Sequence, residues 1–236
     1  MNIIVDIGNT RTKLAYFERN IVQDIQVINH NIDNWSSLLS KHSEAHWIVS
    51  SVKNIDKSIF KDSSVLFFNK ETALPIINQY KSEGLGMDRL ASVVGAYDLF
   101  PNRDCLIIDL GSAITVDFLG RDGIFYGGNI SVGLNFRFKA LHNFTDRLPL
   151  VDSKGDVKLT SDTTELAIRS GVVKSIVYEL EGYIQEYTIK YPDIKIILTG
   201  GDANFFVKQL KKRIFADENL VLKGLNRILN HNVDKK

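Results

Sequence analysis

The sequence has a single cysteine, an almost balanced charge and no long apolar run. With Cys105 alone among 236 residues, an internal disulfide is impossible, and the apolar neighbours of that thiol predict a buried, unreactive side chain. A formal net charge of +1 leaves no basic footprint for nucleic acid. No apolar stretch approaches bilayer length, and the first residues show no basic segment followed by one. We therefore expect a cytoplasmic protein without nucleic-acid or membrane partners.

Two common catalytic motifs are also missing. The sequence contains no G-x-x-x-x-G-K-[ST], which excludes a P-loop, and no G-x-S-x-G nucleophile elbow. Apolar residues make up 44% and charged residues 24%, the usual mix for a folded globular protein. The length allows one large domain or two small ones with a real core.

Apolar and β-branched runs separated by turn residues predict alternating strands and helices. In the first half, strands are expected at 3–5, 12–16, 21–30, 46–52 and 64–69, and helices at 33–43, 53–61 and 89–99. In the second half, strands are expected at 105–109, 114–119 and 124–131, and helices at 134–144 and 163–191. The stretch 193–206 predicts a strand, a Gly-Gly turn and the start of a helix, and 218–231 predicts a short strand and a last helix.

One short pattern occurs twice, about half a chain apart. IIVDIGNTRTKLAYF ends an apolar run at Asp6, and LIIDLGSAITVDFL ends one at Asp109. In both, a glycine, a small polar residue, a threonine and an alternating strand follow. The simplest alternative is a chance likeness of two hairpins, since Asp-x-Gly is common at turns. We read a duplicated α/β domain with two lobes, 1–104 and 105–236. That boundary is soft, because the last helix can pack on the first lobe.

The residues of the first copy suit phosphate and metal. Gly8 lets the backbone approach a phosphate closely, and consecutive N–H groups of such a turn can form an anion-binding nest. Lys13 can add a positive charge. The carboxylate of Asp6 would repel phosphate directly, so it suits a cation that bridges phosphate oxygens.

Seven stretches, taken together and in order, resemble one family. They are DIGNTRTK (6–13), GMDRL (86–90), DLGSAITVD (109–117), GGNISVGL (127–134), TDRLP (145–149), TTELAIRSG (163–171) and LTGGDA (198–203). In this set the chain resembles the type III pantothenate kinases of the acetate kinase, sugar kinase, Hsp70 and actin superfamily. The resemblance implies two ribonuclease-H-like lobes from an actin-like ATPase duplication, with mixed sheets flanked by helices and ATP in the cleft between them. It also implies transfer of the ATP γ-phosphoryl group to pantothenate, the first step of coenzyme A biosynthesis.

The resemblance implies roles for individual residues. Asp88 would be the catalytic base. The ATP phosphate site would comprise Asp6, Ile7, Gly8, Asn9, Thr10, Arg11, Thr12, Lys13 and Ser112. The pantothenate site would comprise Tyr80, Gly86, Met87, Asp88, Arg89 and Thr164. Asp109 would bind a monovalent cation, K⁺ or NH₄⁺, and Asp6 would anchor the Mg²⁺ of ATP, directly or through water. From the residues alone, Asp88 could instead be a helix N-cap with Arg89 in a salt bridge, and Thr164 could cap the next helix.

Two positions depart from the family pattern. Ser112 stands where threonine is usual and keeps the hydroxyl, whereas Val132-Gly133 replaces Pro-Gly and is expected to loosen that turn.

The family also implies a homodimer, with the long helices from Leu134 and Thr164 as candidate interfaces. One alternative reading is a non-catalytic regulatory or accessory protein that uses the same nucleotide-binding fold. Another is an ATPase or sugar kinase.

Overall fold

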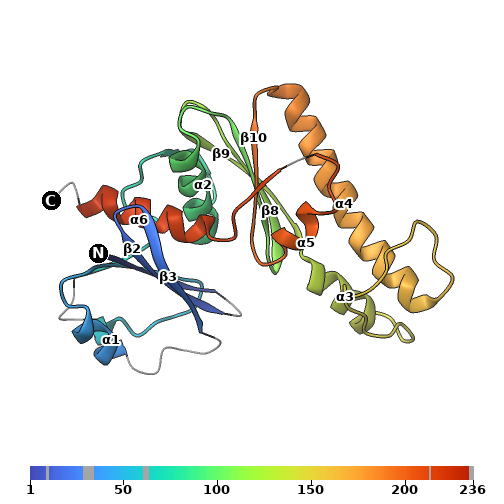
Figure 1. Ribbon diagram of the computed structural model, residues 1–236, viewed down its shortest axis with the longest axis horizontal. Coiled ribbons are helices and arrows are strands. Elements are labelled where there is room, and N and C mark those ends of the chain that lie inside the picture. Colours follow the sequence, from blue (N-terminus) through green and yellow to red (C-terminus); the bar gives the residue numbers. More distant parts are fainter. Residues whose placement is uncertain (9–10, 29–34, 61–63, 213, 234–236) are drawn as a thin grey trace. The chain divides into compact units, whose positions relative to one another are not determined.

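The computed structural model describes residues 1–8, 11–28, 35–60, 64–212 and 214–233. The chain divides into two compact units (Figure 1). Unit 1 comprises Met1–Pro101, Gly123–Phe125 and Asn219–Lys236, and unit 2 comprises Asn102–Asp122 and Tyr126–Glu218. The expected division of the chain into lobes 1–104 and 105–236 stays a prediction.

Unit 1 is built on a five-stranded sheet in the order β3-β2-β1-β4-β5. Its strands are β1 (Asn2–Ile7), β2 (Thr12–Glu18), β3 (Ile21–Ile28), β4 (His46–Ser51) and β5 (Val65–Phe67). Its helices are α1 (Trp35–Lys41), a 3₁₀ turn (Lys57–Phe60), α2 (Met87–Leu99) and α6 (Leu220–Val233). The short β6 (Ile77–Asn78) pairs in parallel with Ile124 and Phe125.

Written in the same direction, the strands of unit 2 have the equivalent order β9-β8-β7-β10-β11. They are β7 (Cys105–Leu110), β8 (Ala113–Leu119), β9 (Ile124–Val132), β10 (Lys195–Thr199) and β11 (Phe215–Ala216). The helices are α3 (Leu134–Asn143), α4 (Thr164–Lys190) and α5 (Ala203–Val207).

The two sheets share one pairing scheme. In each, the first strand pairs antiparallel with the second (β1 with β2, β7 with β8) and parallel with the fourth (β1 with β4, β7 with β10). The fourth strand then pairs parallel with the fifth. Asp6 and Asp109 occupy corresponding places, near the carboxyl end of the first strand. The duplicated α/β fold predicted from the repeated pattern is therefore confirmed.

Helix periodicity explains how each sheet is covered. In unit 2, α4 buries Ile168, Val172, Ile176, Leu180 and Ile184, which recur every four residues and form one apolar stripe. In unit 1, α6 packs against α2 (Figure 1). Gly95 and Gly224 allow this close approach, because a Cβ at either position would strike a backbone carbonyl of the other helix. The glycines thus set how α2 is seated in unit 1.

Several expected boundaries were wrong. Asp6 and Ile7 belong to β1, so the turn begins only at Gly8. The helix expected at 53–61 is reduced to the 3₁₀ turn, and α2 begins at Met87 rather than Arg89. No strand lies within 218–231, because the short strand β11 precedes that stretch. Cys105 is buried as predicted, and burial, with the charge of Asp104, raises the pKa of its thiol to about 12.

Candidate active site

Asp6 lies where β1 meets its phosphate-type turn. Register pairs it with Lys13 on β2 and with Ser50 on β4, and residues opposite one another share a sheet face. Burial and, to a smaller extent, the charge of Asp88 raise the pKa of Asp6 to about 6, and Lys13 acts in the opposite direction. Asp6 is therefore a carboxylate whose negative charge is poorly solvated, which is the condition in which a cation binds favourably.

The turn after Asp6 is closed by one backbone hydrogen bond. The Gly8 N–H donates to the carbonyl of Arg11 over 3.0 Å, and a Cβ at Gly8 would crowd that same carbonyl. Ile7 and Thr12 are buried while Arg11 is exposed. Asn9 and Thr10 lie outside the described residues. A ligand at this turn would consequently meet the backbone and Lys13 rather than the side chain of Ile7.

Asp88 lies in the first turn of α2. The N-cap is Gly86, which has extended backbone angles and no side chain to cap with, so Asp88 does not fill the N-cap role that was weighed for it. Its Oδ1 accepts a hydrogen bond of 2.8 Å from the N–H of Arg89. A Cβ at Gly86 would collide with that same oxygen. The first turn of the helix thus holds the exposed carboxyl group of Asp88 in a fixed orientation.

Arg89 is held beside Tyr80. The guanidinium carbon of Arg89 lies 5.1 Å from the centre of the Tyr80 ring, and Nη1 donates a long hydrogen bond of 3.5 Å to the tyrosine hydroxyl. Tyr80 in turn stacks on Phe125 with ring centres 6.1 Å apart. Arg89 is only 5% exposed, so its fork is rigidly placed. Such a fork suits a carboxylate ligand.

Five of the six residues predicted for pantothenate therefore come together in unit 1: Tyr80, Gly86, Met87, Asp88 and Arg89. The electrostatic effect of Asp88 on Asp6 joins this group to the phosphate-type turn. Thr164 is the exception, because it is the first residue of α4 in unit 2. It does not cap that helix: the hydroxyl of Thr163 accepts the hydrogen bond from the Leu166 N–H. The exposed hydroxyl of Thr164 is left available for a ligand.

In unit 2, Asp109 stands between two threonines. Register pairs it with Thr115 on β8 and with Thr199 on β10, and the three side chains share one face of the sheet. The Oγ1 atoms of both threonines are buried without a hydrogen-bond partner. Buried hydroxyls are rarely left unpaired. A carboxylate flanked by two such oxygens forms a donor set that suits a hard cation.

Glycines let two turns approach Asp109 and Ser112 closely. At Gly200, with φ +90°, a Cβ would strike Oδ1 of Asp109, and at Gly133 it would strike the carbonyls of Gly111 and Ser112. The Gly133 N–H donates to the Ser112 carbonyl over 3.2 Å, and the Asp202 N–H donates to the Leu110 carbonyl over 3.0 Å. The exposed Ser112 is thus surrounded by backbone that can approach a phosphate closely.

A hollow of about 720 Å³ lies elsewhere in unit 2. Aromatic and charged side chains line it, the aromatic ones including Phe118, Tyr126, Tyr187 and Tyr191. Asp104 also lines it, so it lies at the end of β7 opposite Asp109. It contains none of the predicted site residues, and we do not assign the active site to it.

The residues that the sequence reasoning missed are Ser50, Thr115 and Thr199. Each lies beside Asp6 or Asp109 only because a neighbouring strand is in register. The one available signal was a polar residue near the end of an otherwise apolar strand, which occurs for both Ser50 and Thr199.

Two kinds of feature are absent from the described ranges. Over these residues, no three acidic, histidine or cysteine side chains gather as metal ligands. None of the helices there has the length and apolar content needed to cross a bilayer.

Comparison with known proteins places these features in one family. The model of the type III pantothenate kinase family matches residues 2–186. A type III pantothenate kinase of Phocaeicola vulgatus is 45% identical, covering 98% of this chain and 99% of its own. One from Bacteroides fragilis is 46% identical, with 98% of each chain covered.

Solved structures agree on the fold. A Campylobacter jejuni protein titled a conserved putative Baf family transcriptional activator has a TM-score of 0.68 at 22% identity, covering 98% of this chain and 99% of its own. A putative 2-dehydro-3-deoxygalactonokinase of Sinorhizobium meliloti has a TM-score of 0.59 at 10% identity, with 98% and 99% covered. On the family model and the near-full-length relatives, the chain belongs to the type III pantothenate kinase family.

Proposed function

We propose that the protein is an ATP-dependent pantothenate kinase that produces 4′-phosphopantothenate in coenzyme A biosynthesis. The observation that carries this proposal is the grouping, within unit 1, of Asp6, Lys13 and Asp88. Phosphoryl transfer requires little of a protein beyond a positioned carboxylate near the attacking hydroxyl and charge that complements the phosphates. Family membership supplies the substrate, since a fold does not determine one.

Asp88 is the catalytic base of the proposed reaction. It accepts the proton of the primary hydroxyl of pantothenate while that oxygen forms a bond to the γ-phosphorus. The bond from this phosphorus to the β–γ bridging oxygen breaks, and ADP leaves. The Arg89 N–H, in the first turn of α2, keeps Asp88 oriented before the reaction.

Phosphate binding is assigned to the Gly8 turn, Lys13 and Ser112. Magnesium fits Asp6 on the evidence of its own environment, since burial and Asp88 both destabilise the free carboxylate charge. Mg²⁺ needs only one or two protein carboxylates because it keeps several waters and phosphate ligands. When bound, the ion would neutralise charge on the β- and γ-phosphates.

Pantothenate binding is assigned to the Tyr80–Arg89 pair, with Thr164 as a further ligand. The buried, stacked guanidinium is suited to the carboxylate of the substrate. A monovalent cation, K⁺ or NH₄⁺, is assigned to Asp109. The unpartnered hydroxyls of Thr115 and Thr199 support this assignment, because they supply oxygen ligands of the kind that alkali cations accept.

The active form is proposed to be a cytoplasmic homodimer. Large apolar side chains are exposed on the two helices considered as interfaces, Phe136 on α3 and Tyr178 and Ile189 on α4. Light scattering coupled to size exclusion measures the mass directly. A mass of one chain at micromolar concentration would contradict this part of the proposal.

The deciding experiment is a coupled ADP-release assay with ATP, Mg²⁺ and pantothenate, run in potassium and in sodium. We expect turnover that depends on pantothenate and on potassium. Asp88→Asn should lose turnover yet still bind ATP. Asp98→Asn is the matched control, because Asp98 lies at the other end of α2 and pairs with Arg227 over 3.2 Å. A folded, ATP-binding protein without turnover in either salt would instead indicate a non-catalytic regulator.

A further inference from the structure

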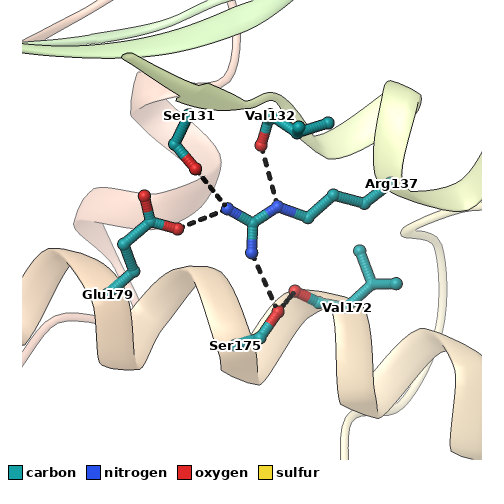
Figure 2. Close-up of polar contacts among 6 residues, drawn as sticks. All are labelled: Ser131, Val132, Arg137, Val172, Ser175 and Glu179. Atoms are coloured by element: carbon teal, nitrogen blue, oxygen red, sulfur yellow. Dashed lines mark hydrogen bonds and ion pairs between the residues drawn. The ribbon is translucent and has the colours of Figure 1, made fainter. Parts of the chain in front are cut away.

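One guanidinium in unit 2 ties a turn to two helices. Arg137, on α3, donates from Nε to the carbonyl of Val132 over 2.8 Å and from Nη2 to the hydroxyl of Ser131 over 3.1 Å. On α4 it pairs with Glu179 and donates from Nη1 to the hydroxyl of Ser175 over 3.1 Å (Figure 2). A single side chain thus joins the end of β9, the start of α3 and the middle of α4.

The ion pair between Arg137 and Glu179 is largely shielded from water. The side chain of Arg137 is 19% exposed and that of Glu179 is 20% exposed, so the ion pair is screened less than a surface pair. The Ser175 hydroxyl is itself oriented, because it donates to the Val172 carbonyl over 2.9 Å. The network on α4 is therefore a fixed support for the guanidinium.

The segment that Arg137 binds packs directly against Ser112. This segment, called the 131–133 turn below, consists of the last two residues of β9 and the N-cap residue of α3. The Gly133 N–H donates to the Ser112 carbonyl. Gly133 sits so close to Gly111 and Ser112 that a Cβ would collide with both of their carbonyls. Val132 does not fix its own backbone as a proline would, so the position of this turn has to be set from outside.

We propose that Arg137 is a positioning residue for the nucleotide: it fixes the 131–133 turn against Gly111–Ser112 and thereby sets the affinity for ATP phosphates. The inference rests on the proposed function for the role of Ser112. The planar fork is essential, because one cation has to meet a carbonyl, two hydroxyls and a carboxylate at the same time. A lysine supplies a point charge without that geometry.

The test compares Arg137→Lys with a matched control, Arg121→Lys. Arg121 also pairs its guanidinium with a carboxylate in unit 2, donating from Nε to Oδ2 of Asp104 over 2.9 Å, but at the end of β7 remote from Ser112. We expect Arg137→Lys to raise the KM for ATP about tenfold, the loss associated with a charged hydrogen bond. We expect kcat and the KM for pantothenate to stay near wild type, and Arg121→Lys to change neither KM.

A second readout does not depend on turnover. The amide of Gly133 should exchange its hydrogen about tenfold faster in Arg137→Lys, with Arg121→Lys unchanged. The affinity for Mg²⁺ and adenylyl imidodiphosphate should fall in parallel. Should Arg137→Lys fail to fold, Ser131→Ala removes one bond and keeps the ion pair, and it should shift both readouts in the same direction by a smaller factor.

The outcomes separate the two proposals. An unchanged KM for ATP with unchanged Gly133 exchange would overturn the positioning role. A lower melting temperature with an equal rise in the KM values for ATP and pantothenate would also overturn it. Such a result would indicate only a loss of general stability. Wild-type protein without pantothenate-dependent turnover would instead refute the kinase proposal. Amide exchange and the affinity for the ATP analogue would then still decide the role of Arg137.

Discussion

Replacing Asp6 by asparagine should make the protein more stable and less active. The pKa of Asp6 is raised from 3.8 to about 6 by burial and by Asp88. A carboxyl whose pKa is higher in the folded chain than in the unfolded chain binds its proton more tightly when folded. Its ionisation therefore opposes folding. At about 1.4 kcal/mol per pH unit this amounts to about 3 kcal/mol above pH 6.

The pH dependence of this gain is specific. Below the unfolded pKa both states are protonated and the cost vanishes. It grows between pH 4 and 6 and is complete above pH 6. Asp6→Asn should therefore raise the free energy of unfolding by about 1–3 kcal/mol at pH 8, since burying the amide offsets part of the gain. By pH 4.5 the advantage should fall by about 2 kcal/mol, because the folded carboxyl is then protonated, whereas the offset from burying the amide does not change with pH.

The assay is thermal and denaturant unfolding of wild type and Asp6→Asn at pH 8 and pH 4.5, without nucleotide. A gain of about 1–3 kcal/mol corresponds to about 2–6 °C for a chain of this size. Magnesium with ATP should stabilise wild type and stabilise Asp6→Asn much less, because the variant lacks the anchor. A variant that is no more stable at pH 8, or one equally stabilised at both pH values, would refute this reasoning.

Three further predictions concern both units. Lys13→Ala should raise the KM for ATP severalfold more than the KM for pantothenate, because the side chain binds the ATP phosphates. Steady-state kinetics measures both constants, and a larger rise for pantothenate would contradict this assignment. Asp109→Asn should flatten the dependence of turnover on potassium, and a potassium titration with an unaltered midpoint and amplitude would remove the cation assignment. Gly224→Ala should lower the free energy of unfolding by about 1–3 kcal/mol, because its Cβ would strike the carbonyl of Ala91. Urea unfolding measures this change. A variant as stable as wild type would show that α6 and α2 can move apart without a loss of stability.

Local patterns in the sequence predicted most of the fold and the core of the site. Period-two alternation located β2 and β8, and the repeated Asp-x-Gly pattern located the two strand ends that carry Asp6 and Asp109. These features depend on neighbours in sequence. The start of α2 was misplaced by two residues because Gly86 caps through backbone conformation alone, whereas cap prediction relies on polar side chains.

Features that depend on distant residues were not predictable. Thr199 reaches Asp109 only after ninety residues of intervening chain have folded into the β7–β10 pairing. Arg137, on a helix with many polar residues, reads as a solvated side chain until α4 brings Ser175 and Glu179 to it. The expectation that Val132 loosens its turn considered only the missing proline, and the arginine five residues later supplies an anchor that no local rule predicts.

The return of α6 to unit 1 has a consequence for synthesis on the ribosome. The side-chain amide of Asn2, the first residue of β1, donates to Oδ1 of Asn226 over 2.8 Å and to Oδ1 of Asn230 over 2.6 Å. The first strand is therefore hydrogen-bonded to the last helix. At about 5–20 residues per second, β1 waits on the order of 10–45 s for this partner. The chain of unit 2 is already complete by residue 218. The second half can therefore finish folding first, while the nascent N-terminal sheet still exposes the apolar face that α6 will cover.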